Sequence, residues 1–331
     1  MTTNVAADPR RRRRLRRSLA VAAVAGLASI GLVASPSAAQ GTQCTGNISS
    51  VIIPGSVSVP AGAACNLTNV LVLGNLDVNE FADLFMDHTT VTGTLKVHSD
   101  AFATVNESTV TSGTVLTDAF GVQATDSTLG GGVNVQGATL FFSVRSTHAG
   151  AVVSNGGWTL IDSGQVAGGI STLNDAHFSL VDSSVAGHIT VTQSDTGALI
   201  CQTTVAGKTK LQNSGGAVQV GGELPTPACG SNTLIGGLEV YDNTAGSINI
   251  ASNLVIGSLI CTGNSAQPHG SSNLIIGPRI GQCNSLVPAG GSLMGGIESG
   301  GEASQVPDGV TDPDDVRAAM EALINGRAAA R

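Results

Sequence analysis

The sequence predicts an all-β protein, a parallel β-helix or β-solenoid of about twelve coils with about 19 residues each. Three observations predict this fold class. A glycine recurs at nearly constant intervals, apolar and polar residues alternate after each glycine, and Gly, Val and Thr are abundant while aromatic residues are few. Short repeats that cannot bury a hydrophobic face alone form a core by stacking on one another.

The repeat is marked by one glycine in each coil. Similar phrases recur with it, such as TTVTGTLKV at residues 89–97 and SSVAGHITV at residues 183–191. The intervals between successive glycines are 19, 19, 20, 18, 19, 18, 19, 20, 29, 21 and 20 residues. The twelve glycines are Gly55, Gly74, Gly93, Gly113, Gly131, Gly150, Gly168, Gly187, Gly207, Gly236, Gly257 and Gly277.

The residues after each glycine alternate in polarity. The second and fourth residues are mostly apolar, as in Leu76 and Val78; after Gly113 they are Val115 and Thr117. Residues two apart lie on the same side of a strand. We therefore expect these residues to face the core and the intervening ones to face water. The period of two and the Val and Thr content argue against a helical repeat.

Stacked coils place their strands about 4.8 Å apart, so twelve coils predict a rod of roughly 55 Å. A sandwich or barrel would show turns about every 8–12 residues without a constant register. The solenoid is expected to span residues 40–289. Its two ends expose strand edges, and we expect a cysteine-closed loop to cover each of them.

Six cysteines follow residue 39, and an even number in an exported chain indicates disulfides. Pairing each cysteine with its neighbour in the sequence closes three loops of about one repeat. Metal binding is the alternative, but the chain contains no CxxC pair. The expected pairs are Cys44–Cys65, Cys201–Cys229 and Cys261–Cys283.

One interval of 29 residues marks an insertion with the sequence GGELPTPACG at residues 221–230. Pro225 and Pro227 cannot donate hydrogen bonds to a β-ladder. We therefore expect this insertion to protrude as a loop, which Cys229 ties back to the coil of Cys201.

The first 39 residues are predicted to be a secretory signal peptide. Residues 10–17 contain seven arginines, residues 18–33 are apolar, and Ser37, Ala38 and Ala39 provide small residues for cleavage. A transmembrane anchor is the alternative, but the apolar run is shorter than the roughly 18 residues of a usual span. A secreted, extracellular location is expected, with the export route left open.

The C-terminal region is expected to contain a linker and a helix. Residues 290–311 are rich in Gly and Ser, and residues 312–331 resemble a helix that begins at Asp312 and Pro313. The helix either folds back over the solenoid or docks a partner protein; a tail that does not fold is the third alternative. Its predicted apolar face consists of Val316, Met320, Leu323 and Ile324.

The charge of the chain argues against two classes of partner. Residues 1–39 hold seven of the 15 basic residues and one of the 23 acidic residues. The remaining chain therefore has 8 basic and 22 acidic residues, a net charge of −14. Nucleic acids and anionic membrane surfaces attract clustered positive charge. Neither is expected as a partner, and no membrane span is expected after residue 39.

The two ends of the predicted solenoid carry a resemblance to known proteins. The phrases CTGNISSVIIPGSVSVPAGAAC at residues 44–65 and SLICTGNSAQPHGSSNLIIGPRIGQC at residues 258–283 resemble exported β-helix proteins of actinobacteria. The resemblance covers residues 44–283 and implies a parallel β-helix with a right-handed winding. It implies no activity, so no functional residue is carried over from it.

A column of mostly charged residues precedes the glycines by five or six positions. An acidic residue followed by Ser is natural at a corner, where its carboxylate bonds nearby backbone N–H groups. Alternatively, carboxylates one coil apart would repel unless a Ca²⁺ ion joined them. Asp162 and Asp182 are the candidate calcium ligands. The column consists of Asp87, Glu107, Asp126, Arg145, Asp162, Asp182 and Gln202.

The same edge holds the candidate residues of an enzyme. β-Helices include enzymes that cleave polysaccharides, and hydrolysis needs two carboxylates at a defined spacing. Arg145 with Asp126 and Asp162 is the candidate set for a lyase or hydrolase. His148 interrupts an apolar column three residues after Arg145; it is either a hydrogen-bonded core residue or a further member of the set.

We favour a secreted, non-enzymatic solenoid that serves as a structural or binding scaffold, with a cell-wall or extracellular glycan among the possible ligands. A polysaccharide-active enzyme is the first alternative. An ice or crystal-surface binder is the second, because Thr residues recur once per coil. The proposed row consists of Thr89, Thr109, Thr128 and Thr147.

Overall fold

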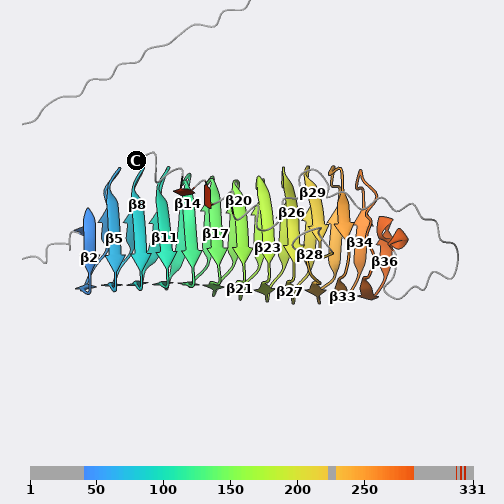
Figure 1. The fold of residues 1–331 in the computed structure, drawn as a ribbon, viewed down its shortest axis with the longest axis horizontal. Helices are drawn as coiled ribbons and strands as arrows, with labels where there is room; N and C mark the ends of the chain where they lie inside the picture. Colours follow the sequence, from blue (N-terminus) through green and yellow to red (C-terminus); the bar gives the residue numbers. More distant parts are fainter. Residues whose placement is uncertain (1–40, 223–228, 287–317, 319–320, 323, 326–331) are drawn as a thin grey trace, which may run out of the picture. The chain divides into compact units, whose positions relative to one another are not determined.

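The computed structural model describes residues 41–222 and 229–286, together with residues 318, 321, 322, 324 and 325. Residues 41–222 and 229–286 form an all-β parallel solenoid of about twelve coils, which confirms the predicted fold class (Figure 1). A coil contributes strands in turn to three parallel sheets, here called A, B and C. The right-handed winding stays a prediction.

Sheet A has 13 strands in chain order, so each strand pairs with those of the adjacent coils. Inward residues such as Leu95 and Val97 are buried and alternate with more exposed ones, as the sequence pattern predicts. The strands are β1 (Thr42–Gln43), β4 (Val57–Val59), β7 (Leu76–Val78), β10 (Thr94–Val97), β13 (Gly113–Thr117), β16 (Val133–Gln136), β19 (Val152–Asn155), β22 (Ile170–Leu173), β25 (Ile189–Thr192), β28 (Thr209–Gln212), β31 (Leu238–Tyr241), β34 (Leu259–Thr262) and β36 (Arg279–Gly281).

Sheet B has 11 strands, most of them five residues long. Its middle strands are buried on both faces, unlike the strands at its N-terminal end. The strands are β2 (Gly46–Ser49), β5 (Ala64–Thr68), β8 (Asp83–Asp87), β11 (Phe102–Asn106), β14 (Gly121–Thr125), β17 (Leu140–Val144), β20 (Trp158–Asp162), β23 (His177–Val181), β26 (Gly197–Cys201), β29 (Ala217–Val220) and β32 (Ile248–Ile250).

Sheet C has 12 strands of only two or three residues, each with one inward residue. The strands are β3 (Ile52–Ile53), β6 (Leu71–Val72), β9 (Thr90–Val91), β12 (Thr109–Val110), β15 (Thr128–Leu129), β18 (Thr147–His148), β21 (Gln165–Val166), β24 (Ser184–Val185), β27 (Thr204–Val205), β30 (Thr233–Leu234), β33 (Leu254–Ile256) and β35 (Leu274–Ile276).

The corners between sheets use two kinds of backbone. The corners before sheet B and before sheet C turn through one left-handed residue, such as Asp100 (φ 54°) before β11 and Glu107 (φ 43°) before β12. Asn, Asp and other polar residues occupy most of these positions, although left-handed φ is uncommon outside glycine. The corner from sheet C to sheet A contains the glycine column.

The glycine column exists because neighbouring coils touch there. A Cβ atom on Gly187 would lie 2.6 Å from the amide nitrogen of Gly169 and 2.7 Å from the carbonyl carbon of Gly168. Gly150 and Gly207 are equally close to the backbone of the preceding coil. Close approach of stacked backbones, rather than a left-handed φ, therefore requires glycine at Gly187.

The predicted register is wrong by one residue at a single coil. The strand register of β10 with β13 puts Ser112, not Gly113, in the glycine column. Thr114 and Leu116 consequently face the core and are buried, whereas Val115 is only half-buried. Gly113 and the column position are adjacent in the sequence, so the period alone did not distinguish them. A shift of one residue moves every side chain of a strand to the opposite face of the sheet.

All three predicted disulfides are present. Cys44 pairs with Cys65, Cys201 with Cys229, and Cys261 with Cys283, with Cα–Cα distances of 5.5, 5.0 and 5.1 Å. The first and last bridges join the coils at the two ends of the solenoid, and the middle one ties the insertion to β26. Residues 223–228 lie outside the described residues, so the predicted protrusion of the insertion stays a prediction.

Beyond β36, the chain forms the 3₁₀ helix η1 (Gln282–Ser285). Of the predicted C-terminal helix, the described residues 318, 321, 322, 324 and 325 are helical. The predicted signal peptide at residues 1–39 and the predicted linker at residues 290–311 lie outside the described residues.

Candidate functional site

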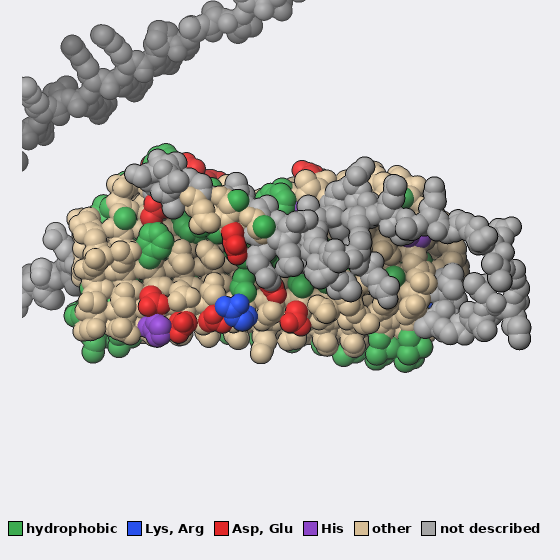
Figure 2. All heavy atoms as spheres, in the orientation of Figure 1, with side chains coloured by type: hydrophobic (Ala, Val, Ile, Leu, Met, Phe, Trp, Pro, Cys, Tyr) green, Lys and Arg blue, Asp and Glu red, His purple; other side chains and the backbone are tan. Residues whose placement is uncertain are grey.

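The predicted charged edge is in fact two columns. Glu107, Asp126 and Asp182 are left-handed corner residues between sheets B and C, together with Arg145 and Gln202. Asp87 and Asp162 instead end strands β8 and β20 of sheet B, one residue before the corner. Figure 2 shows acidic, basic and histidine side chains gathered in a row along the lower border of this face.

A buried ladder of hydroxyl and amide side chains lies behind the corner residues. The Ser108 hydroxyl accepts a hydrogen bond from the Thr89 N–H (2.9 Å), and Ser127 accepts from the Ser108 N–H (3.1 Å). The residue after the corner, rather than the corner carboxylate, thus binds the backbone of the preceding coil. The ladder consists of Thr89, Ser108, Ser127, Ser146, Ser183, Thr203, Asn232, Asn253 and Asn273.

Arg145 is held by Asp126 of the preceding coil. Its Nε and Nη2 atoms donate to the two carboxylate oxygens at 2.8 and 2.7 Å, a bidentate geometry. The hydrogen bond and the charge of Arg145 lower the pKa of the Asp126 carboxyl. Both side chains are about half exposed, so we expect this pair to contribute little to stability.

His88 pairs with two acids in the same row. Its Nδ1 lies 3.1 Å from Asp87, and its Nε2 lies 2.9 Å from Glu107. The hydrogen bond with Asp87 is the largest cause of a raised pKa at His88, and the charge of Glu107 adds to it. Arg145, and His88 when it carries a proton, therefore offset part of the negative charge of this edge.

The candidate calcium ligands lie in adjacent coils. The Ser163 hydroxyl donates to Asp162 at 2.8 Å and lies 3.5 Å from Asp182. Asp162 is buried, whereas Asp182 is exposed. Within the described part of the chain, no group of three or more His, Cys, Asp or Glu residues has the arrangement of a metal site. Calcium binding stays a prediction.

His148 lies inside the solenoid, in the inward column of sheet C. It is fully buried, its Nε2 lies 2.9 Å from the Ser143 hydroxyl, and its ring meets Phe141 edge-on at 5.8 Å. Burial lowers its pKa from 6.5 to about 4. The structure therefore does not bring His148 together with Arg145 and Asp126, which lie on the outer surface.

We expect His148 to make the protein sensitive to acid. Because its folded-state pKa is lower than its unfolded one, stability is lost as the pH falls from 6.5 towards 4, by about 3 kcal/mol. The double variant S143A/H148L should lose less stability over this range, since Leu fits the column that already contains Leu129. Urea unfolding at pH 7 and pH 4.5 measures the loss of stability in each protein. His188→Gln removes an exposed histidine and is the control. An equal loss in S143A/H148L and in the unmodified chain would contradict the prediction.

A second buried titratable group lies at the corner before sheet B. Oδ1 of Asp175 accepts hydrogen bonds from the Ser154 hydroxyl (3.0 Å) and the Gly156 N–H (3.1 Å), and its Oδ2 has no hydrogen-bond partner among the described atoms. Burial raises the pKa of Asp175 to about 6, although these hydrogen bonds oppose the shift. Asp175 is therefore a core acid rather than part of a surface site.

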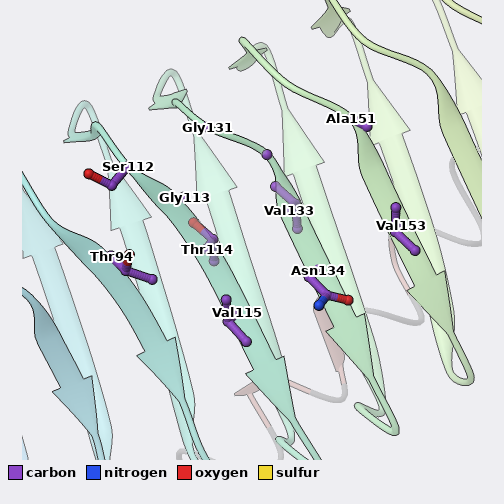
Figure 3. A pocket seen from close by; sticks show the side chains of 11 residues that line it. Thr94, Ser112, Gly113, Thr114, Val115, Gly131, Val133, Asn134, Ala151 and Val153 are labelled. Atoms are coloured by element: carbon purple, nitrogen blue, oxygen red, sulfur yellow. The ribbon is translucent and has the colours of Figure 1, made fainter.

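The described surface also carries a groove on sheet A. Two adjoining hollows of about 430 and 330 Å³ share Ala151 and Val153 and follow the starts of β10, β13, β16, β19 and β22. Figure 3 shows the residues that line the first of them. Successive coils place Gly113, Gly132, Ala151 and Gly169 in one row. Four consecutive coils thus have almost no side chain there, which leaves a trough about 20 Å long.

The groove has a neutral lining. Its described lining residues are glycines, small aliphatic residues, Ser, Thr and Asn, with His188 at one end and no Lys, Arg, Asp or Glu. Along its side, successive coils place Val115, Asn134, Val153, Ser171 and Thr190 in one row. This surface can offer hydroxyl, amide and apolar contacts to an extended, uncharged ligand.

Comparison of the chain with protein-family models, with curated proteins and with solved structures finds no match.

The three disulfides are typical of a protein from an oxidising, extracellular environment. Among the described residues, no helix is long and apolar enough to cross a membrane.

The predicted threonine row needs one correction. Thr89 is a buried member of the ladder, so its place in the row belongs to Thr90 of β9. The register aligns Thr90, Thr109, Thr128 and Thr147 on the outer face of sheet C. The 19-residue spacing between Thr109 and Thr128 also leads back from Thr109 to Thr90 rather than to the adjacent Thr89.

The sequence interpretation did not find the groove or Asp175. The groove had a signal in the second glycine of the pairs at residues 131–132 and 168–169, which lie two coils apart. Asp175 gave no signal, because exposed corner positions are acidic as well.

Proposed function

We propose that this chain is a secreted, non-enzymatic scaffold that binds a neutral extracellular or cell-wall glycan along the sheet A groove. The supporting observation is the continuity of the groove across successive coils. An extended polymer matches its shape, and the uncharged lining suits hydroxyl groups better than carboxylates or phosphates.

The other features support a durable rod. Disulfides at both ends restrain the terminal coils, and the buried ladder satisfies backbone groups at a corner of most coils. Binding along a rigid row costs little conformational entropy in the protein. A rod of this kind can hold a polymer without chemical change.

Ala151→Phe is expected to abolish or weaken glycan binding at least about tenfold, because a ring at the shared residue blocks both hollows. Ala149→Phe is the matched control, since this exposed alanine lies two residues away and outside the groove. Retention of the chain from residue 40 on insoluble neutral glycans and polyuronates, with a count of new reducing ends, measures both properties. Equal glycan binding by the two variants would contradict binding along the groove. The appearance of new reducing ends would contradict a non-enzymatic role.

A crystal-surface binder is the second candidate function. Thr90-Val91-Thr92 and Thr109-Val110-Thr111 place two threonines on the outer face of sheet C in neighbouring coils. The second threonine column ends there, because Gly130 replaces it in the next coil. A measurement of thermal hysteresis tests this candidate, and a zero value rules out ice binding.

A further inference from the structure

Sheet B carries a second hydrophobic cluster on its outer face. Leu140, Phe142 and Leu160 alternate with the inward residues Phe141 and Ile161, so they point away from the solenoid core. They are nevertheless buried, with at most 1 % of their surface exposed. Outward side chains of this size would be open to water on a bare solenoid.

This cluster is aromatic, although the chain has few aromatic residues. Four of the nine Phe, Trp and Tyr residues belong to it or pack against it. The rings of Phe102 and Phe120 meet edge-on at 5.7 Å. We call the set the outer aromatic cluster; it consists of Phe102, Phe120, Leu140, Phe142, Val144, Trp158 and Leu160.

One residue from the far end of the chain packs against the outer aromatic cluster. Ile324 is partly buried there, while its helical neighbours Ala318, Glu321 and Ala322 are exposed. This contrast is typical of an amphipathic helix lying on an apolar surface. The sequence places Val316, Met320 and Leu323 on the same helical face as Ile324.

We propose that the outer aromatic cluster is a docking site for the chain's own C-terminal helix. The 31 residues of segment 287–317 can reach up to about 100 Å. From β36 back to the coil of β17 is seven coils, or about 35 Å. A tethered helix also has a far higher effective concentration than one from another molecule.

The docked helix serves to cover an apolar patch that would otherwise promote association. Exposed aromatic patches on exported proteins bind other surfaces or aggregate. The site is on sheet B and is separate from the sheet A groove, so this inference does not depend on glycan binding.

Trp158 is the only tryptophan in the chain and reports on the docking site directly. In the chain from residue 40, Ile324→Glu should shift Trp158 emission to longer wavelength and raise its acrylamide quenching constant about twofold, because the ring loses its cover. Ala322→Glu is the matched control, since it adds the same charge to an exposed position of the same helix. It should leave both signals unchanged.

A synthetic peptide of residues 308–331 completes the test. Added to the Ile324→Glu chain, it should restore the emission, whereas a peptide with the same substitution should not. Unchanged emission in Ile324→Glu, or an equal change in Ala322→Glu, would overturn the proposal. A dimeric mass of the unmodified chain, with emission that depends on concentration, would assign the site to a second copy's helix instead. Far-ultraviolet circular dichroism confirms that each variant retains the solenoid.

Discussion

Gly187→Ala is expected to lower the free energy of unfolding by about 3 kcal/mol. The new Cβ would lie within 2.7 Å of three backbone atoms of the preceding coil, and backbone cannot move aside as a flexible side chain can. Separating the two coils would also stretch the hydrogen bonds of the adjoining sheets. Urea or thermal unfolding of the chain from residue 40 measures the loss.

Gly55→Ala is the matched control for this prediction. It occupies the same column at the first coil, where a Cβ would meet nothing within 4 Å and φ is not left-handed. Alanine there should be neutral or stabilise by about 0.4–1 kcal/mol, because it restricts the unfolded chain. If the two variants lose equal stability, intrinsic backbone preference rather than coil contact explains the glycine column.

Asp175→Asn is expected to stabilise the protein by about 3 kcal/mol at pH 7.5. The pKa of Asp175 is about 6 in the folded chain and 3.8 ordinarily, so folding favours the protonated acid. Its contribution to stability is therefore present below pH 3.8 and lost as the pH rises through 6. Asparagine keeps an oxygen for Ser154 and Gly156 and removes the buried charge.

The pH dependence distinguishes this effect from a general change in packing. The difference between Asp175→Asn and the unmodified chain should be near zero at pH 4 and greatest above pH 7. Taking the difference at each pH cancels the opposite contributions of His148 and His177, whose pKa values burial lowers to about 4. Asp195→Asn changes an exposed acid in the next coil and should alter stability little. A difference independent of pH would contradict the assignment.

The functional surfaces were less predictable than the fold. Arg145 and Asp126 were expected to be near each other, and their bidentate contact follows from the 19-residue spacing. The burial of His148 also agrees with its apolar column. The groove and the outer aromatic cluster depend instead on side chains in several coils, and on a helix that follows the solenoid by some 30 residues.

The sequence by itself determined the solenoid, its coil length and the inward columns, because these properties repeat along the chain at nearly constant intervals. It also determined the three disulfides, because each joins two cysteines that are neighbours in the sequence. The tertiary structure alone decided the register at Ser112, the burial of Asp175 and the contact of Ile324. The physical reason is that a strand corner can shift the alternation by one residue, and such a shift exchanges the buried and exposed faces. Contacts between residues far apart in the chain leave no period that the sequence could show.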